Sequence, residues 1–324
     1  MRREVSMETY VFADALTGSS ITCGFPQLDA VVDRKSELSS SCSSLFFPGC
    51  SLINFGLPLV EAVYETLSAA GSVDGISLLC CGKILSFEHD GATVRASFED
   101  QLRDSLVAAG VTRIVAACPN CVVALRSMLE LDERTAGIQV DVLPAVLADL
   151  GYVIDADVAK RMVADAAGVA ADDVLVSIHD SCPDRDTGEF ADGIRSLIPR
   201  ELMVSSRHER ERSLCCGSLL RAEGKDQAAD ALAHKLGEDG RALGVSAFVV
   251  GCASCAFQLT VSQSALLVFH YLELLYDWRI PWENASTYMK LRFLFDEALG
   301  AVESGGGSRT FAALDAPVDK EPSS

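Results

Sequence analysis

The feature that most constrains the fold of this chain is a set of cysteines that occurs twice. Ten of the twelve cysteines form two matching sets, each with a single cysteine, an adjacent pair followed by glycine, and a CxxC motif. The first set is Cys50, Cys80, Cys81, Cys118 and Cys121, and the second is Cys182, Cys215, Cys216, Cys252 and Cys255. Equivalent cysteines lie 132 to 135 positions apart, LCCG occurs in both sets, and AACPNC aligns with VGCASC. This self-similarity indicates an internal duplication.

Short strands and amphipathic helices are expected to alternate around these cysteines. Apolar runs precede most of them, such as SLFF before Cys50, RIVAA before Cys118 and AFVV before Cys252. Helical patterns follow, including LPLVEAVYETLSAAG and DQAADALAHKLGEDGRALG. The alternation predicts an α/β fold of two duplicated domains, each built from right-handed βαβ units around a parallel sheet. Ligands in such sheets bind at the carboxyl ends of the strands, where the ten cysteines are expected.

The remaining segments are assigned by composition and pattern. We expect an N-terminal extension without a clear period, two cysteine domains joined by a helical connector, a C-terminal helical segment and a disordered tail rich in Gly, Ser and Pro. The corresponding ranges are 1–44, 45–155, 156–173, 174–280, 281–302 and 303–324. Cys23 and Cys42 lie in the extension, match no metal motif, and are interpreted as incidental.

Five thiols at each site indicate a metal centre. Thiolates held close together raise one another's pKa, and a soft metal removes this conflict by binding the sulfurs. Gly82 and Gly217 follow the adjacent cysteines and permit a positive φ in a tight turn. A structural zinc ion needs four ligands, whereas a multi-iron cluster with a bridging thiolate uses the fifth. Iron–sulfur is therefore favoured, with zinc as the alternative.

Composition excludes several other classes. The net charge of −19 disfavours binding to nucleic acid or to an anionic membrane. The first twenty residues lack the pattern of a secretory signal, and the apolar run at 265–276 is too short to span a bilayer. A cytoplasmic protein is expected, with any membrane association made through a partner subunit. Neither a Rossmann nor a Walker A motif occurs, so no flavin or nucleotide site is expected.

The repeated CCG pattern resembles the CCG, or cysteine-rich, domain family over about residues 45–272. Its best-known member is the catalytic subunit of heterodisulfide reductase. The resemblance implies that each five-cysteine set holds a noncubane 4Fe–4S cluster and that a disulfide is reduced between the two clusters. The chain has a short first interval of 29 residues and lacks the CxxCxxCxxxCP ferredoxin run of many relatives. Electrons would then come from a ferredoxin-like iron–sulfur subunit or a flavoprotein.

Three functions remain open at this point. The favoured one is an oxidoreductase subunit that reduces a small disulfide, or oxidises a dithiol, at two iron–sulfur clusters. A second is a non-catalytic electron-transfer subunit between a flavin dehydrogenase or reductase and a quinone-linked or ferredoxin-linked partner. A third is a zinc-bearing structural or assembly module.

Non-cysteine candidates are few. His179 closely precedes Cys182 and is a candidate proton donor to a leaving thiolate, although a structural role at a strand end is favoured. Lys83 follows the first cysteine pair and would stabilise an anionic cluster or a substrate carboxylate, or be a solvated loop residue. Glu88-His89-Asp90 reads as a polar loop, and His270 as a structural residue.

Overall fold

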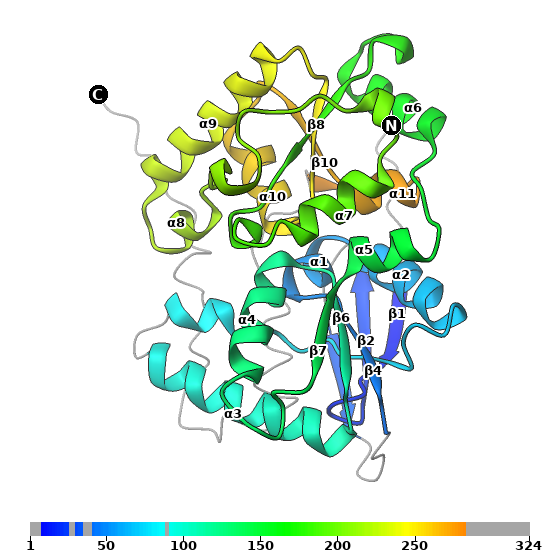
Figure 1. Cartoon of the computed structure of the whole chain (residues 1–324), viewed down its shortest axis with the longest axis vertical. Coiled ribbons are helices and arrows are strands. Elements are labelled where there is room, and N and C mark those ends of the chain that lie inside the picture. The colour runs from blue at the N-terminus through cyan, green and yellow to red at the C-terminus, as the bar shows by residue number, and fades with distance from the viewer. Residues whose placement is uncertain (1–7, 26–29, 35–40, 88–90, 283–324) are drawn as a thin grey trace.

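The structure is a computed structural model that describes residues 8–25, 30–34, 41–87 and 91–282. Figure 1 shows two α/β halves stacked along the long axis of the molecule. We call them the first half, from β4 to α5, and the second half, from β8 to α11. The tail 303–324, the Glu88-His89-Asp90 loop and all but two residues of the predicted segment 281–302 lie outside the described residues.

The first half contains a four-stranded parallel sheet with the order β5-β4-β6-β7. Its strands are β4 (Ser44–Phe47), β5 (Gly75–Ile76), β6 (Arg113–Ala116) and β7 (Gln139–Val142). Its helices are α1 (Cys50–Phe55), α2 (Leu57–Ala69), α3 (Gly91–Ala109), α4 (Pro119–Leu129) and α5 (Leu143–Asp149). Consecutive apolar residues Leu45, Phe46 and Phe47 are all fully buried, as expected for a parallel strand covered on both faces.

The second half contains a three-stranded parallel sheet with the order β10-β9-β8. Its strands are β8 (Val176–His179), β9 (Ala247–Val250) and β10 (Leu267–His270). Its helices are α7 (Glu189–Leu197), α8 (Ser218–Ala222), α9 (Asp226–Ala242), α10 (Ala253–Ser262) and α11 (Tyr271–Leu275), preceded by the connecting helix α6 (Ala156–Ala167). The predicted α/β fold with duplicated parallel units is therefore confirmed.

The two sheets have the same strand order, with one difference before Cys215. In the first half, β5 pairs with β4 on the side away from β6. At the equivalent place in the second half, only a single bridge joins Met203 to Val176 of β8. In place of a strand, the segment ELMVSSRHERERSL contributes one residue pair to the sheet, and two short 3-10 turns, Arg200–Leu202 and Arg210–Arg212, lie before and after Met203.

The segment before the first half forms a three-stranded antiparallel sheet, which we call the N-terminal meander. Its strands are β1 (Glu8–Ala13), β2 (Ser19–Phe25) and β3 (Ala30–Arg34), in that order. The side chains of β2 alternate between buried and half-buried, but two of the inward residues are Ser19 and Cys23. A strand whose buried face includes small residues gives a weak hydrophobic alternation, which is why the sequence shows no clear period here.

The two halves contact each other close to the carboxyl ends of their strands. The rings of Phe55 in α1 and Phe257 in α10 stack with their centroids 5.1 Å apart. The hydroxyls of Ser51 and Ser254 lie 2.6 Å apart across the same boundary. These contacts bring the cysteine-bearing edges of the two sheets together.

Helices long and apolar enough to cross a bilayer are absent from the part of the chain that the structure describes.

Candidate metal centre

All of the predicted cysteine ligands follow strands or occupy the turns beyond them. Cys50 begins α1 after β4, and Cys182 begins a 3-10 turn after β8. Cys118 and Cys252 are the N-cap residues of α4 and α10, directly after β6 and β9. Each CxxC motif therefore spans a strand end and the first turn of a helix. That geometry directs both of its sulfurs toward the same edge of the sheet.

The adjacent cysteines lie on tight turns that end in a left-handed glycine. Gly82 and Gly217 have φ values of 74° and 94°, as their sequence context predicts. A Cβ atom on Gly217 would lie 2.6 Å from the carbonyl oxygen of Ala229, so no larger residue fits this turn. The backbone N–H of Gly217 also donates to the sulfur of Cys215 at 3.3 Å, a contact of the kind that tunes a sulfur-bound metal.

The sulfurs of each half form one connected group. In the first half, the Cys80 and Cys50 sulfurs lie 3.7 Å apart, and further thiol hydrogen bonds connect the order Cys50, Cys80, Cys81, Cys121, Cys118. In the second half, the Cys182 and Cys215 sulfurs lie 3.9 Å apart and those of Cys216 and Cys255 lie 3.1 Å apart. Here the connected order is Cys182, Cys215, Cys216, Cys255, Cys252. The two groups thus repeat the same internal order.

The two groups meet at Cys118 and Cys252. Interaction with the Cys118 thiol across the boundary lowers the pKa of Cys252. The side-chain amide of Asn120 lies 3.7 Å from the Cys252 sulfur and spans the same boundary. The two sites therefore adjoin.

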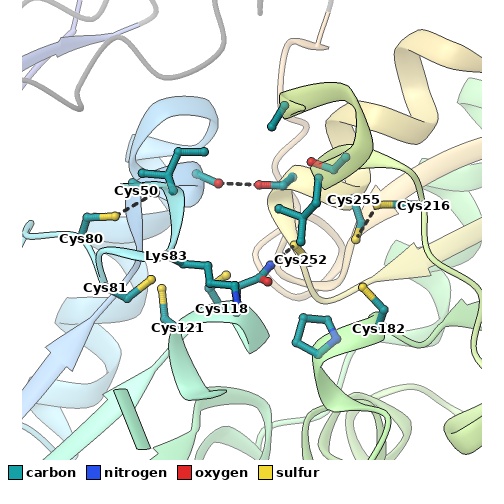
Figure 2. A pocket seen from close by; sticks show the side chains of 18 of the residues that line it. Cys50, Cys80, Cys81, Lys83, Cys118, Cys121, Cys182, Cys216, Cys252 and Cys255 are labelled. Carbon is teal, nitrogen blue, oxygen red and sulfur yellow. Dashed lines mark hydrogen bonds between the residues drawn. The ribbon is translucent and has the colours of Figure 1, made fainter. Parts of the chain in front are cut away.

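One pocket has all ten of these cysteines in its wall. Figure 2 shows the labelled cysteines of the first half on one side of this pocket and those of the second half on the other. Cys50, Cys182 and Cys215 are half-buried, whereas the other seven are buried. Among the described residues in the wall, Lys83 carries the one positive charge. The pocket therefore borders both five-cysteine sets.

The thiols strongly perturb one another. Hydrogen bonding from Cys182 lowers the pKa of Cys215, and the same interaction raises the pKa of Cys182. Hydrogen bonding with Cys121 likewise lowers the pKa of Cys81. Buried sulfur donors that cannot all ionise together suit a soft metal, which stabilises several thiolates at once. The donor set therefore fits a thiolate-bound metal centre in each half.

His179 lies beside the second group of sulfurs. One of its ring nitrogens is within 4.8 Å of the sulfurs of Cys216 and Cys255, and these three residues form a possible metal-binding group. Burial lowers the pKa of His179 and so favours the neutral ring. Its Nε2 atom has no hydrogen-bond partner among the described residues. In the first half, the equivalent position at the end of β4 is Phe47, so the two sites differ here.

The structure also places polar residues at the site that the sequence analysis did not single out. Ser51, Asn120 and Ser254 line the pocket, and the last two lie inside the CxxC motifs, which is the signal that could have identified them. Cys23 and Cys42 are buried but do not line the pocket. Cys42 donates to Asp74 at 3.2 Å. The buried His270 is the N-cap residue of α11, away from the pocket wall.

The fold and the site define a duplicated α/β protein whose strand ends carry two five-cysteine sets as candidate metal ligands. Residues 44–126 and 156–260 match the family described as CCG, cysteine-rich domain. Because the match covers more than half of the chain, the protein belongs to the CCG cysteine-rich domain family.

Two other comparisons add little to this assignment. No curated protein matches the chain. Among solved structures, the chain is similar to the crystal structure of glutamate racemase isoform RacE1 from Bacillus anthracis, with a TM-score of 0.30 and 12% sequence identity, over 74% of this chain and 79% of that one. A likeness of this size has no bearing on the chemistry of the site.

Proposed function

We propose that the chain is an iron–sulfur oxidoreductase subunit, similar to the catalytic subunit of heterodisulfide reductase, that reduces a small disulfide or oxidises the corresponding dithiol. The main observation in support is that both five-sulfur groups line one pocket and adjoin at Cys118 and Cys252. A ligand in this pocket contacts both groups at once.

The electron count of the reaction supports two adjoining sites. Cleaving a disulfide consumes two electrons and two protons and yields two thiols. A cluster bound at each five-cysteine set would supply one electron at a time. Two such sites on one pocket match the requirement of the substrate. The electrons would come from a ferredoxin-like iron–sulfur subunit or a flavoprotein.

The chain's own residues would bind and orient the substrate. Lys83 is half-buried in the pocket wall and is suited to bind a carboxylate or another anionic group. Ile84 and Leu219, which follow the two cysteine pairs at equivalent positions, supply apolar surface on both sides. A small disulfide with an anionic group on one side complements this wall.

The test uses protein purified and reduced under anaerobic conditions. It is mixed with small disulfides that carry, or lack, a carboxylate, and the released thiol is measured beside the recovery of visible absorbance as the protein is reoxidised. The proposal expects two thiols for each two electrons lost by the protein. Electron exchange with a flavoprotein and no thiol release would instead establish an electron-transfer subunit. A colourless protein containing zinc would establish the structural module.

A further inference from the structure

Asp14 is a buried carboxylate in the N-terminal meander, outside both family-matched regions. It lies just beyond β1 and is 1% exposed. Its Oδ1 accepts hydrogen bonds from the backbone N–H groups of Leu16 and Thr17, both at 3.0 Å. Its Oδ2 accepts from the Ser77 hydroxyl at 2.9 Å and from the Leu78 N–H at 2.7 Å. One carboxylate thus joins the meander to the segment that precedes the first cysteine pair.

The contact fixes the backbone up to the first metal site. The Ser77 hydroxyl, which donates to Asp14, also accepts the N–H of Leu79 at 3.3 Å. The N–H of Ala15 donates to the carbonyl oxygen of Ile76 at 2.9 Å. Each residue from Ile76 to Leu79 therefore bonds to Asp14, to Ala15, or to the Ser77 hydroxyl that Asp14 binds. Cys80 is the next residue in the chain. The meander sets the path on which this cysteine pair enters the site.

The second half holds its equivalent loop in another way. Arg185 donates from Nη2 to the carbonyl oxygen of Ser213 at 2.8 Å and from Nε to the Ser213 hydroxyl at 3.3 Å. Ser213 is 3% exposed and stands two residues before Cys215, as Leu78 stands two residues before Cys80. A guanidinium from within the second half thus occupies the role that a carboxylate from the meander has in the first.

We infer that Asp14 and Arg185 are matched positioning residues, each setting the geometry of one cysteine pair and therefore of one metal site. The N-terminal meander is then a structural part of the first site. The identity of the metal in this inference rests on the proposed function. The claim that each residue holds one cysteine loop in place does not. A selective effect on one site is expected, because among the described residues the hydrogen bonds of Asp14 reach the first loop and those of Arg185 reach the second.

Hydrogen exchange on the whole chain, purified anaerobically, tests whether each residue holds its own cysteine loop in place. In the wild-type protein, the donors around Asp14 bond to a carboxylate; in Asp14→Asn, some of them would face an amide N–H instead. Hydrogen exchange in the peptide covering residues 77–82 should therefore accelerate roughly tenfold. The peptide covering 213–217 should stay unchanged. Arg185→Met should give the reverse pattern. Val11→Ala, on the exposed face of β1, is the control and should change neither peptide.

Iron retention tests the consequence for the metal. Asp14→Asn is placed in two backgrounds, Cys215→Ser with Cys216→Ser, which leaves only the first site, and Cys80→Ser with Cys81→Ser, which leaves only the second. In the first background, iron transfer to a chelator should become roughly 10-fold faster and the electron paramagnetic resonance signal should shift, whereas the second background should be unaffected. Ser77→Ala, which removes a single donor, should give a smaller effect in the same direction if Asp14→Asn folds poorly.

Equal acceleration at both loops, or at neither, overturns the inference. So does equal iron loss in the two backgrounds. If the unmodified protein contains no iron, the proposed function fails, and the exchange pattern still decides whether the two positioning residues act as inferred.

Discussion

Cys118 and Cys252 occupy equivalent positions in the two halves, and the Cys118 thiol lowers the pKa of Cys252 across the boundary between them. Cys118 is the N-cap residue of α4, and Cys252 is the N-cap residue of α10. Their contact turns two groups of five sulfurs into one continuous array of ten. The duplication therefore produced a pocket with a cysteine site on each side, which no single copy could form.

Removing one CxxC pair should empty one site and leave the other. We expect Cys118→Ser with Cys121→Ser to lower the iron content by about half, because the second five-cysteine set remains complete. Cys252→Ser with Cys255→Ser should give the same loss from the other side. Iron analysis measures the effect, with Cys23→Ala as the control because this buried thiol lies outside the pocket. Full iron loss in either double variant would mean that the two sites are not separate centres.

Lys83 should determine the preference for anionic substrates. We expect Lys83→Met to raise KM for a carboxylate-bearing disulfide by about tenfold, the worth of one partly exposed charged hydrogen bond. The KM for a neutral disulfide should not change, and Lys83→Arg should restore most of the binding. Steady-state kinetics with the matched disulfides measure the difference. An equal change for both substrates would contradict the assigned role.

His179 should tune the second site because its neutral ring lies beside the sulfurs of Cys216 and Cys255. His179→Phe introduces the residue found at the equivalent position of the first half. It should retain the iron but lower the reduction potential of the second centre by roughly 40 mV, because phenylalanine has no N–H to offer to a sulfur of the loaded site. A redox titration followed by electron paramagnetic resonance measures the shift. Loss of iron would make His179 a ligand, whereas lost turnover at an unchanged potential would make it a proton donor.

Glu273 should make stability depend on pH. Burial raises the pKa of this carboxyl group to about 7, from an ordinary value of 4.5. The folded state therefore holds the proton more tightly than the unfolded state. The resulting stabilisation is complete below pH 4.5 and is lost as the pH rises to about 7.

Replacing Glu273 by glutamine should remove this dependence. The difference in free energy of unfolding between the two proteins should change by about 3 kcal/mol across that range, in favour of the variant at high pH. Chemical denaturation at several pH values between 5 and 8 measures it. Parallel curves for the two proteins would show that the carboxyl group titrates normally.

The sequence predicts the repeat well, because the cysteine motifs and their spacing can be read directly from it. The α/β class and the placement of Cys50 and Cys118 beyond strands follow from short apolar runs. The identity of His179 as a neighbour of Cys216 does not follow, because the two are far apart in the chain and meet only through packing of β8 against the second loop.

The N-terminal meander could not be predicted from the sequence. Its inward residues include Ser19 and Cys23, so hydrophobic alternation is weak, and its hydrogen bonds to the segment before Cys80 come from Asp14 and Ala15. A single hydrogen-bonded residue leaves no periodic signal in a sequence. Likewise, the segment before Cys215 makes one bridge where the first half has the strand β5, and the polar residues that follow form a turn.

The most direct test of two iron–sulfur centres is the iron and acid-labile sulfide content of the protein purified without oxygen, read beside its visible spectrum. We predict a brown protein with about eight irons per chain and matching sulfide, as two four-iron centres require. A colourless protein with about one zinc ion per five-cysteine set and no labile sulfide would contradict this prediction.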